Sequence, residues 1–322
     1  MRSLRWIGLL ALYVGSQAVG LALAQPFRSE GLASTSNPQS PTAPLFFIAI
    51  IVLAPLFILF FARRRGGIAA LRQLILLAIA GSLTFTLYAS FALVYPNTYL
   101  LPPYAAELPI DPALIAAATL SAAIYLALLV EPQWYIVDLA GFLAAGSLVA
   151  ILGISFAILP AFILLGALMV YDAIAVYRTK HMVSLADVVT EMKLPILMVM
   201  PESPGYDYTA APTLQTQRQQ PVEERAALFM GLGDVVIPGT LVVSAFIWLP
   251  ATPALLGVAA SLWVAVGALV GSLAGYAVLM QRVLRGNPQA GLPFLNGGAM
   301  LGYALAYVLV FRSYTLGLTG GL

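Results

Sequence analysis

The sequence predicts an all-α polytopic membrane protein of nine transmembrane helices, with the N-terminus in the cytoplasm and the C-terminus outside. Of its 322 residues, 61% are hydrophobic and only 9% are charged, which is too apolar for a soluble domain. The apolar residues form runs near the roughly 20 residues that a transmembrane helix needs. Basic residues gather at alternate breaks between these runs, and this asymmetry sets the orientation.

Polar, Gly-rich or Pro-rich breaks delimit the first six predicted spans. These spans cover residues 6–24, 44–62, 68–95, 111–130, 134–152 and 154–177. The first also resembles a cleavable signal peptide ending near Ala24, but its length of about 19 residues favours a retained helix. Arg63-Arg64-Arg65-Gly66-Gly67 ends the second span, and a Pro- and Tyr-rich loop over 96–110 ends the third. Glu131-Pro132-Gln133 divides the fourth from the fifth, and Gly153 divides the fifth from the sixth.

A long loop over about 182–225 separates the first six spans from the last three, which cover residues 226–249, 254–281 and 294–314. We expect one membrane-embedded domain over 1–322, with spans 1–6 within about 1–181 and spans 7–9 within about 226–322. Small residues at helical spacing on spans eight and nine predict close helix packing. They are Gly267, Gly271 and Gly275 on the eighth span, and Gly298, Gly302 and Ala306 on the ninth.

Nearly all basic residues fall in segments predicted to lie on the same side of the membrane as the N-terminus, the cytoplasmic side. The predicted cytoplasmic segments contain Arg2, Arg5, Arg63, Arg64, Arg65, Arg72, Arg178, Lys180, Lys193, Arg218, Arg225, Arg282 and Arg285. Only Arg28 and Arg312 fall on the other side. Because basic residues are retained in the cytoplasm, this bias predicts that the 178–225 segment is cytoplasmic and the C-terminus is outside.

The composition also restricts the chemistry that the chain can perform. It has no cysteine, which excludes disulfides, thiolate nucleophiles and iron–sulfur ligation. The single histidine, His181, excludes clusters of histidine ligands and disfavours a Ser-His triad. Lysine occurs only at Lys180 and Lys193, on either side of a loop, so a Ser-Lys dyad has little support. Among hydrolytic chemistries, carboxylates remain.

Two aspartates lie within predicted spans, where a charged side chain costs roughly 2.5–3.5 kcal/mol on insertion scales. Asp172 lies six residues before Arg178, and Asp234 lies nine residues after Arg225. At 1.5 Å per residue, the two carboxylates are roughly 9 and 13 Å from the cytoplasmic ends of their spans. Antiparallel neighbouring helices would therefore bring them to a similar depth.

Two facing carboxylates in a membrane suit acid–base catalysis with an activated water. They cannot both ionise cheaply, so they share one proton. The ionised carboxylate can take a proton from water while the protonated one hydrogen-bonds the scissile carbonyl. The structural alternative is that each aspartate only hydrogen-bonds a neighbouring helix. A third acid, Asp138, is expected to be interfacial and structural.

These residues resemble the motifs of presenilin and signal peptide peptidase, which are nine-span intramembrane aspartyl proteases. Tyr171-Asp172 and Gly231-Leu232-Gly233-Asp234 are similar to the two catalytic motifs of that family. A third family motif, Pro-Ala-Leu, stands at the start of the last span. Here Pro293-Phe294-Leu295 occupies that place, with Phe294 departing from the pattern. Motif order, spacing and span count agree along most of the chain.

The resemblance implies an intramembrane aspartic endopeptidase of the Gly-x-Gly-Asp type, a multi-pass protein of the cell membrane. Its substrates would be transmembrane segments or signal peptides in the lipid bilayer, and its catalytic residues Asp172 and Asp234. The residues expected to support the active site or bind substrate are Tyr171, Gly231, Leu232, Gly233, Pro293, Phe294 and Leu295. The resemblance implies no metal, no other cofactor and no nucleic acid, and it leaves a homo-oligomer open.

Two other functions are compatible with carboxylates in a membrane. A proton- or cation-coupled transporter also uses paired acids, but it would predict inverted repeats and broken helices in both halves of the chain. No such symmetry is visible, and both aspartates lie in the second half. A non-catalytic scaffold is disfavoured because two buried acids are costly.

The connection between the two aspartate-bearing spans contains an apolar run over 195–200 that predicts an extended strand, bounded by Pro195 and Pro201. A helical substrate must unwind before water can reach a peptide carbonyl, and its freed backbone groups then need new partners. A strand on the enzyme would supply them. The alternative is that the run only lies at the membrane interface.

Overall fold

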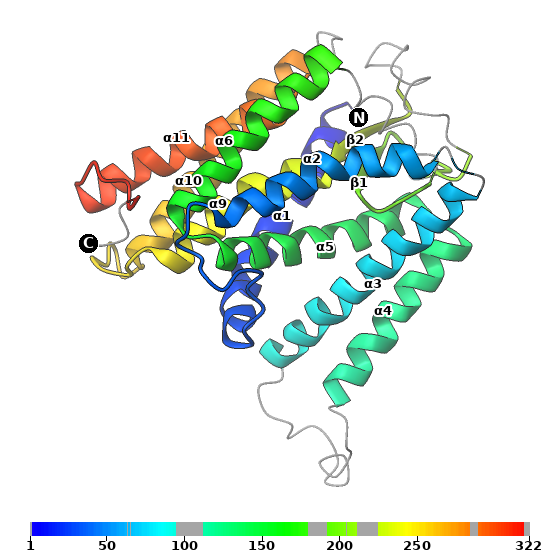
Figure 1. Cartoon of the computed structure of the whole chain (residues 1–322), viewed down its shortest axis with the longest axis horizontal. Helices are drawn as coiled ribbons and strands as arrows, with labels where there is room; N and C mark the ends of the chain where they lie inside the picture. The colour runs from blue at the N-terminus through cyan, green and yellow to red at the C-terminus, as the bar shows by residue number, and fades with distance from the viewer. Residues whose placement is uncertain are drawn as a thin grey trace.

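The computed structural model describes residues 2–62, 64, 66–94, 112–179, 192–203, 205–210, 225–283 and 289–318. Over these residues the chain forms nine α-helices and one two-stranded sheet (Figure 1). The helices are α1 (Arg2–Ser29), α2 (Ala43–Ala62), α3 (Gly67–Val94), α4 (Pro112–Val130), α5 (Trp134–Ser155), α6 (Ile158–Ile174), α9 (Leu232–Trp248), α10 (Ala260–Val283) and α11 (Leu292–Phe311). The strands are β1 (Leu197–Pro201) and β2 (Ala227–Gly231).

Eight of the helices in the described part of the chain are long and apolar enough to cross a bilayer. The ninth, α9, is also apolar but has only 17 residues. The predicted polytopic all-α fold is therefore confirmed. Span seven was expected to be helical from residue 226, but residues 227–231 instead form β2, which leads directly into α9.

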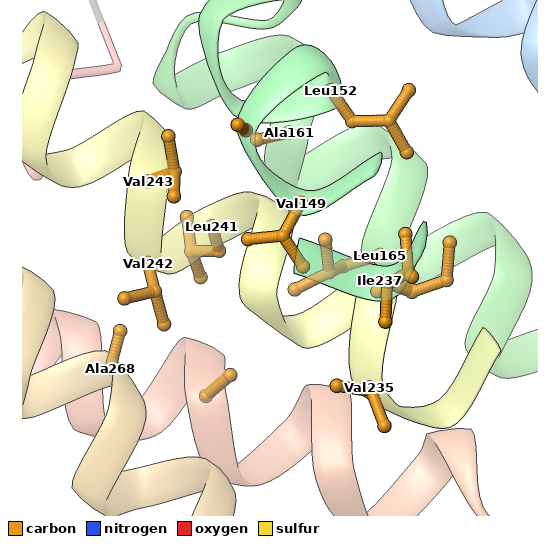
Figure 2. Close-up of a cluster of buried hydrophobic side chains, with 14 of the residues drawn as sticks. Val149, Leu152, Ala161, Leu165, Val235, Ile237, Leu241, Val242, Val243 and Ala268 are labelled. Atoms are coloured by element: carbon orange, nitrogen blue, oxygen red, sulfur yellow. The ribbon is translucent and has the colours of Figure 1, made fainter. Parts of the chain in front are cut away.

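Helix α9 lies in the middle of the bundle and packs against α1, α5, α6, α10 and α11. Apart from Asp234, Thr240 and Ser244 its residues are apolar, and nearly all of them are buried, as expected of a helix with neighbours on most sides. Figure 2 shows the α9 side chains Ile237, Leu241 and Val242 among buried side chains of its neighbours, here Val149 of α5, Leu165 of α6 and Ala268 of α10. The core therefore holds α9 from several sides.

The boundary between α5 and α6 differs from the prediction. Gly153 was expected to divide the two spans, but it lies inside α5. A Cβ atom there would overlap the side chain of Val243 on α9, so this glycine permits a close helix contact. The break comes at Phe156 and Ala157, just before a helix start that carries Pro160 in its first turn.

Helices α10 and α11 pack through the predicted small residues. A Cβ atom on Gly271 would overlap the carbonyl oxygen of Gly298, and one on Gly302 would overlap that of Gly267. The two backbones are therefore in direct contact, and the predicted packing face is confirmed. The same contact extends to Gly275, which lies against the Phe294 carbonyl in the first turn of α11.

The two strands pair antiparallel, from Leu197 opposite Gly231 to Pro201 opposite Ala227. The strand predicted over 195–200 is thus confirmed for residues 197–200, but Pro201, expected to lie beyond it, is the last residue of β1. Its partner is the segment before α9. Arg5 of α1 holds the far end of this hairpin: its Nη1 donates to the Arg225 carbonyl at 2.8 Å, and Nη2 lies 3.6 Å from Glu202.

Candidate active site

Asp172 lies in the last turn of α6, which continues as a π-helical turn over Ala175–Thr179. Its Oδ2 accepts a hydrogen bond from the backbone N–H of Leu292 at 3.0 Å, and the N–H of Gly291 also bonds the carboxylate. Leu292 is the first residue of α11. The first N–H groups of a helix have no partner within it, and they favour a negative charge. The start of α11 therefore fixes the position of the Asp172 carboxylate.

Asp234 is the third residue of α9 and follows directly from the hairpin. Its carboxylate accepts a hydrogen bond from the backbone N–H of Gly231, the residue that caps this helix. An acidic side chain at the third position that bonds back to the cap residue forms half of a capping box. Local helix-start chemistry thus aims the Asp234 side chain back toward the strand.

The two carboxylates meet at the start of α11. An ideal Cβ atom built on Gly291 would lie 2.9 Å from Oδ1 and 3.2 Å from Oδ2 of Asp234. The neighbouring residue, Leu292, bonds Asp172. Asp172 and Asp234 also interact electrostatically with each other. Three segments far apart in sequence therefore bring two acids to one point inside the bundle.

Gly291 and Leu292 were not among the predicted site residues, although Gly291 adjoins both aspartates and the Leu292 N–H bonds Asp172. The prediction covered the next three residues instead, Pro293, Phe294 and Leu295, in the first turn of α11. The signal for Gly291 was a glycine just before a helix-starting proline. Tyr177 was also missed: its hydroxyl lies 3.1 Å from Gln289 Oε1 and accepts a bond from the Ala290 N–H at 3.3 Å.

The other predicted site residues lie around this point. Tyr171 is half-buried and interacts electrostatically with Asp172. Leu232 is buried, and its N–H donates to the Ile196 carbonyl at 3.0 Å. Gly233 is exposed, and a Cβ atom there would meet nothing within 4 Å. Open space therefore adjoins Asp234 on the side of Gly233.

Leu295 is buried beneath the start of α11, and Pro293 and Phe294 are half-buried. The Arg282 guanidinium lies 5.3 Å from the centre of the Phe294 ring, which is a cation–π contact. This position departs from the alanine of the family motif, and Phe294 uses its larger ring to connect α11 with the end of α10.

Asp138, predicted to be an interfacial structural residue, is only 6% exposed and lies in the first turns of α5. Its Oδ1 accepts a hydrogen bond from the Val199 N–H at 2.6 Å. Asp138 therefore holds β1 against α5 and takes no part in the contact between Asp172 and Asp234. Within the described ranges, no three His, Cys, Asp or Glu side chains are grouped so as to hold a metal ion.

A polytopic helix bundle with two carboxylates meeting inside it is the architecture of an intramembrane aspartyl protease, and comparisons with known proteins identify the same class. The family model described as "Signal-peptide peptidase, presenilin aspartyl protease" matches residues 10–312. The chain belongs to this family. It is therefore an intramembrane aspartyl protease and a multi-pass membrane protein that acts on transmembrane substrates in the bilayer, which confirms the predicted resemblance and sets aside the transporter hypothesis.

Two solved structures of a presenilin family intramembrane aspartate protease, in C222 and P2 space groups, are similar to the chain over most of its length. The first has 31% sequence identity and a TM-score of 0.64, and the match covers 94% of this chain and 98% of that one. The second has 31% identity and a TM-score of 0.62, and it covers 94% of this chain and 97% of the other. No curated protein matches the sequence at a significant level.

Proposed function

We propose that the protein is a Gly-x-Gly-Asp type endopeptidase in which Asp172 and Asp234 are the catalytic pair. The observation that carries this proposal is the convergence of both carboxylates on Gly291 and Leu292. Carboxylates that interact this closely share one proton, which provides a base and an acid together. The whole chain, 1–322, acts as one membrane-embedded unit, because the elements that form the pair come from its middle and its end.

The reaction needs one water and no covalent intermediate. The ionised carboxylate takes a proton from water, whose oxygen attacks the scissile carbonyl carbon, while the protonated carboxylate hydrogen-bonds the carbonyl oxygen. The C–N bond then breaks as the amine leaves with a proton. The products are a carboxylic acid and an amine, and the pair returns with a single proton.

The remaining predicted site residues have supporting roles in this proposal. Gly233 leaves open space beside Asp234 for the backbone of a transmembrane segment or a signal peptide. Gly231 and Leu232 connect the hairpin to the first turn of α9, and Tyr171 lies next to the acid pair. Pro293 to Leu295 shape the helix start whose N–H groups hold Asp172. Its proposed partners are membrane-embedded substrates rather than nucleic acid.

The cleavage rate should show a bell-shaped dependence on pH. A pair with one proton has both an acid and a base, whereas two protons leave no base and none leaves no acid. The measurement is hydrolysis of a labelled transmembrane peptide in detergent across the pH range in which the protein remains folded. A rate that rises monotonically through that whole range would contradict a shared proton, and an absence of any peptide cleavage would contradict the endopeptidase itself.

The basic residues support an orientation with the N-terminus and the hairpin in the cytoplasm. The chain has no cysteine, so single engineered cysteines give clean labelling. Ser203→Cys, on an exposed hairpin position, should react with an impermeant thiol reagent only from the cytoplasmic side. Ser36→Cys, exposed between α1 and α2, is the matched control and should react only from outside. The reverse pattern would overturn the orientation and move the acid pair to the outer half.

We also propose that an unwound substrate adds as a strand to β2. In an antiparallel pair, every second residue turns its backbone groups toward the partner strand, and the residues between turn theirs outward. The bonds from Leu232 N–H to the Ile196 carbonyl and from Glu202 N–H to the Ala226 carbonyl fix this alternation. Phe229 therefore points its N–H and C=O away from β1. Within the described residues β2 has no strand on that side. On β1, in contrast, the outward N–H of Val199 is already taken by Asp138. We therefore expect the substrate to pair with β2 at Phe229, which lies five residues before Asp234. The sequence alone had favoured the strand over 195–200 for this role.

Phe229→Pro removes the outward N–H while keeping the pairs that join β1 to β2, and proline is tolerated on an edge strand. We expect a roughly tenfold or larger loss in cleavage of a helical substrate, because an unwound segment loses one backbone partner. Phe229→Leu keeps the N–H and should cleave at nearly the wild-type rate. Both variants should still bind a small transition-state mimic at the acid pair. Full cleavage by Phe229→Pro would refute strand addition at this edge.

A further inference from the structure

A group of polar side chains is buried next to Asp234 within the apolar core. Tyr13 and Gln17 lie on α1, and Ser272 and Tyr276 lie on α10. Each pair is spaced four residues apart, so its members share one helix face. Tyr13, Gln17 and Ser272 are completely buried, and Tyr276 is 5% exposed. We call these four residues the polar cluster.

The polar cluster adjoins the catalytic pair. The Tyr13 hydroxyl lies beside the side chains of Gln17 and Ser272 and is close enough to Asp234 to interact electrostatically with it. The rings of Tyr13 and Tyr276 are 6.0 Å apart. Helices α1 and α10 both pack against α9, the helix that carries Asp234. Helices α1 and α10, which carry neither aspartate, therefore bring polar side chains close to Asp234.

Within the described residues, Tyr13 Oη, Gln17 Oε1, Gln17 Nε2 and Tyr276 Oη have no hydrogen-bond partner outside the polar cluster. Inside the cluster, the Tyr13 hydroxyl interacts with the side chains of Gln17 and Ser272. The Ser272 hydroxyl donates to the Leu269 carbonyl at 2.7 Å, which leaves its lone pairs as acceptors. Buried polar groups that lack sufficient partners are destabilising, so a cluster whose members meet only one another is expensive.

Two other buried tyrosines, both on α11, are satisfied. Tyr303 and Tyr307 are completely buried, like Tyr13. The Tyr303 hydroxyl donates to the Leu316 carbonyl at 2.9 Å, and the Tyr307 hydroxyl lies 3.1 Å from Thr315 Oγ1. Tyr208, which is also completely buried, likewise has no partner for its hydroxyl within the described residues, so the polar cluster is distinguished by several such atoms in one place and not by Tyr13 alone. The polar cluster needs a small partner that both donates and accepts hydrogen bonds.

We propose that the polar cluster is an internal water site that supplies the hydrolytic water to Asp234. Buried waters typically make two to four hydrogen bonds to otherwise unpaired groups, and the cluster provides both donors and acceptors. A charged ligand is disfavoured because none of its four members is a cation or a carboxylate. Each cleavage consumes one water in a site surrounded by hydrocarbon, so a reserved site shortens resupply. This proposal rests on the catalytic role of Asp234 proposed above.

The first test separates water binding from packing. Gln17→Met replaces the amide by an apolar side chain of similar shape and removes two unpaired buried atoms, so thermal stability should be unchanged or higher. The kcat should fall roughly tenfold, with KM unchanged, because a water contact is lost and no substrate contact is. Tyr13→Phe should show the same pattern. Full kcat in both variants would overturn the role in supplying water.

Tyr303→Phe is the matched control, since this tyrosine is just as buried but donates to a backbone carbonyl. Removing its hydroxyl leaves the Leu316 carbonyl unpaired, so thermal stability should fall while kcat per folded molecule stays the same. The cluster variants should thus lose kcat and keep their stability, whereas the control should lose stability and keep its kcat. If the cluster variants lost stability and kept their kcat, as the control does, the cluster would be structural.

The second test detects the water directly. Brief X-ray radiolysis in oxygen-18 water forms hydroxyl radicals from bound water, which label the side chains beside it. Tyr13 and Tyr276 should be labelled despite their burial, whereas Tyr303 and Tyr307 should not. The result should be the same in folded Asp172→Asn protein, so it is independent of catalysis. Labelling of Tyr13 as low as that of Tyr303 would overturn the water site even if Asp234 is catalytic.

Discussion

Replacing either aspartate of the pair by asparagine is expected to abolish peptide-bond cleavage and to leave the protein folded. Asparagine has nearly the same shape but neither accepts nor donates the catalytic proton, so the rate should fall by about 10³-fold or more. The fold should persist because an amide oxygen can still accept the bonds from Leu292 N–H at Asp172 and from Gly231 N–H at Asp234. The measurement is hydrolysis of a labelled transmembrane peptide, with thermal unfolding in detergent recorded alongside.

The matched control for this pair is a third buried acid, Asp138. Asp138→Asn also keeps its structural bond, because the amide oxygen can accept from the Val199 N–H. It should retain most activity, since it does not touch the acid pair. Cleavage at a wild-type rate by Asp172→Asn or by Asp234→Asn, or equal inactivation by all three substitutions, would contradict the two-aspartate mechanism.

A methyl group on Gly291 is expected to displace the Asp234 carboxylate. In Gly291→Ala, the new Cβ would lie 2.9 Å from Oδ1 and 3.1 Å from Cγ of Asp234, so the carboxylate must move. The backbone of Gly291 has φ −78° and ψ −48°, which alanine adopts freely, so the fold should be retained. A misplacement of about 1 Å can cost a hundredfold in rate, and we expect a loss of that order in kcat.

Two other glycines of α10 and α11 make this prediction specific. A Cβ atom on Gly297 would meet nothing within 4 Å, so Gly297→Ala should keep full activity and slightly stabilise α11. Gly271→Ala would overlap the Gly298 carbonyl, so it should lower stability first and activity only as a consequence. Wild-type kcat in Gly291→Ala would show that the Asp234 carboxylate does not need its observed position.

The helices and the two aspartates were predictable from sequence for a local reason. Hydrophobic length and the distribution of basic residues are properties of continuous segments, and a bilayer demands them span by span. Asp172 and Asp234 were recognisable because acids are rare in such segments. The strand was also visible, since Pro195 and Pro201 disfavour a helix there and the residues between them favour extended backbone.

Predictions failed where a residue has a role that depends on a distant neighbour. Gly153 was interpreted as a helix break because glycine has low helix propensity, but its role is contact with Val243 of α9. The start of span seven was misplaced because residues 227–231 are as apolar as a helix, and only pairing with β1 makes them a strand.

By itself, the sequence determined the membrane fold class and the two acids at similar depth, because hydropathy, charge bias and motif residues are all written along the chain. Only the tertiary structure decided what surrounds those acids. It placed Gly291 beside both carboxylates and the Leu292 N–H on Asp172. It also paired the outward N–H of Val199 with Asp138 and brought Tyr13 close to Asp234. Each of these contacts joins segments that are remote in sequence, and such contacts depend on how the helices pack rather than on any local pattern.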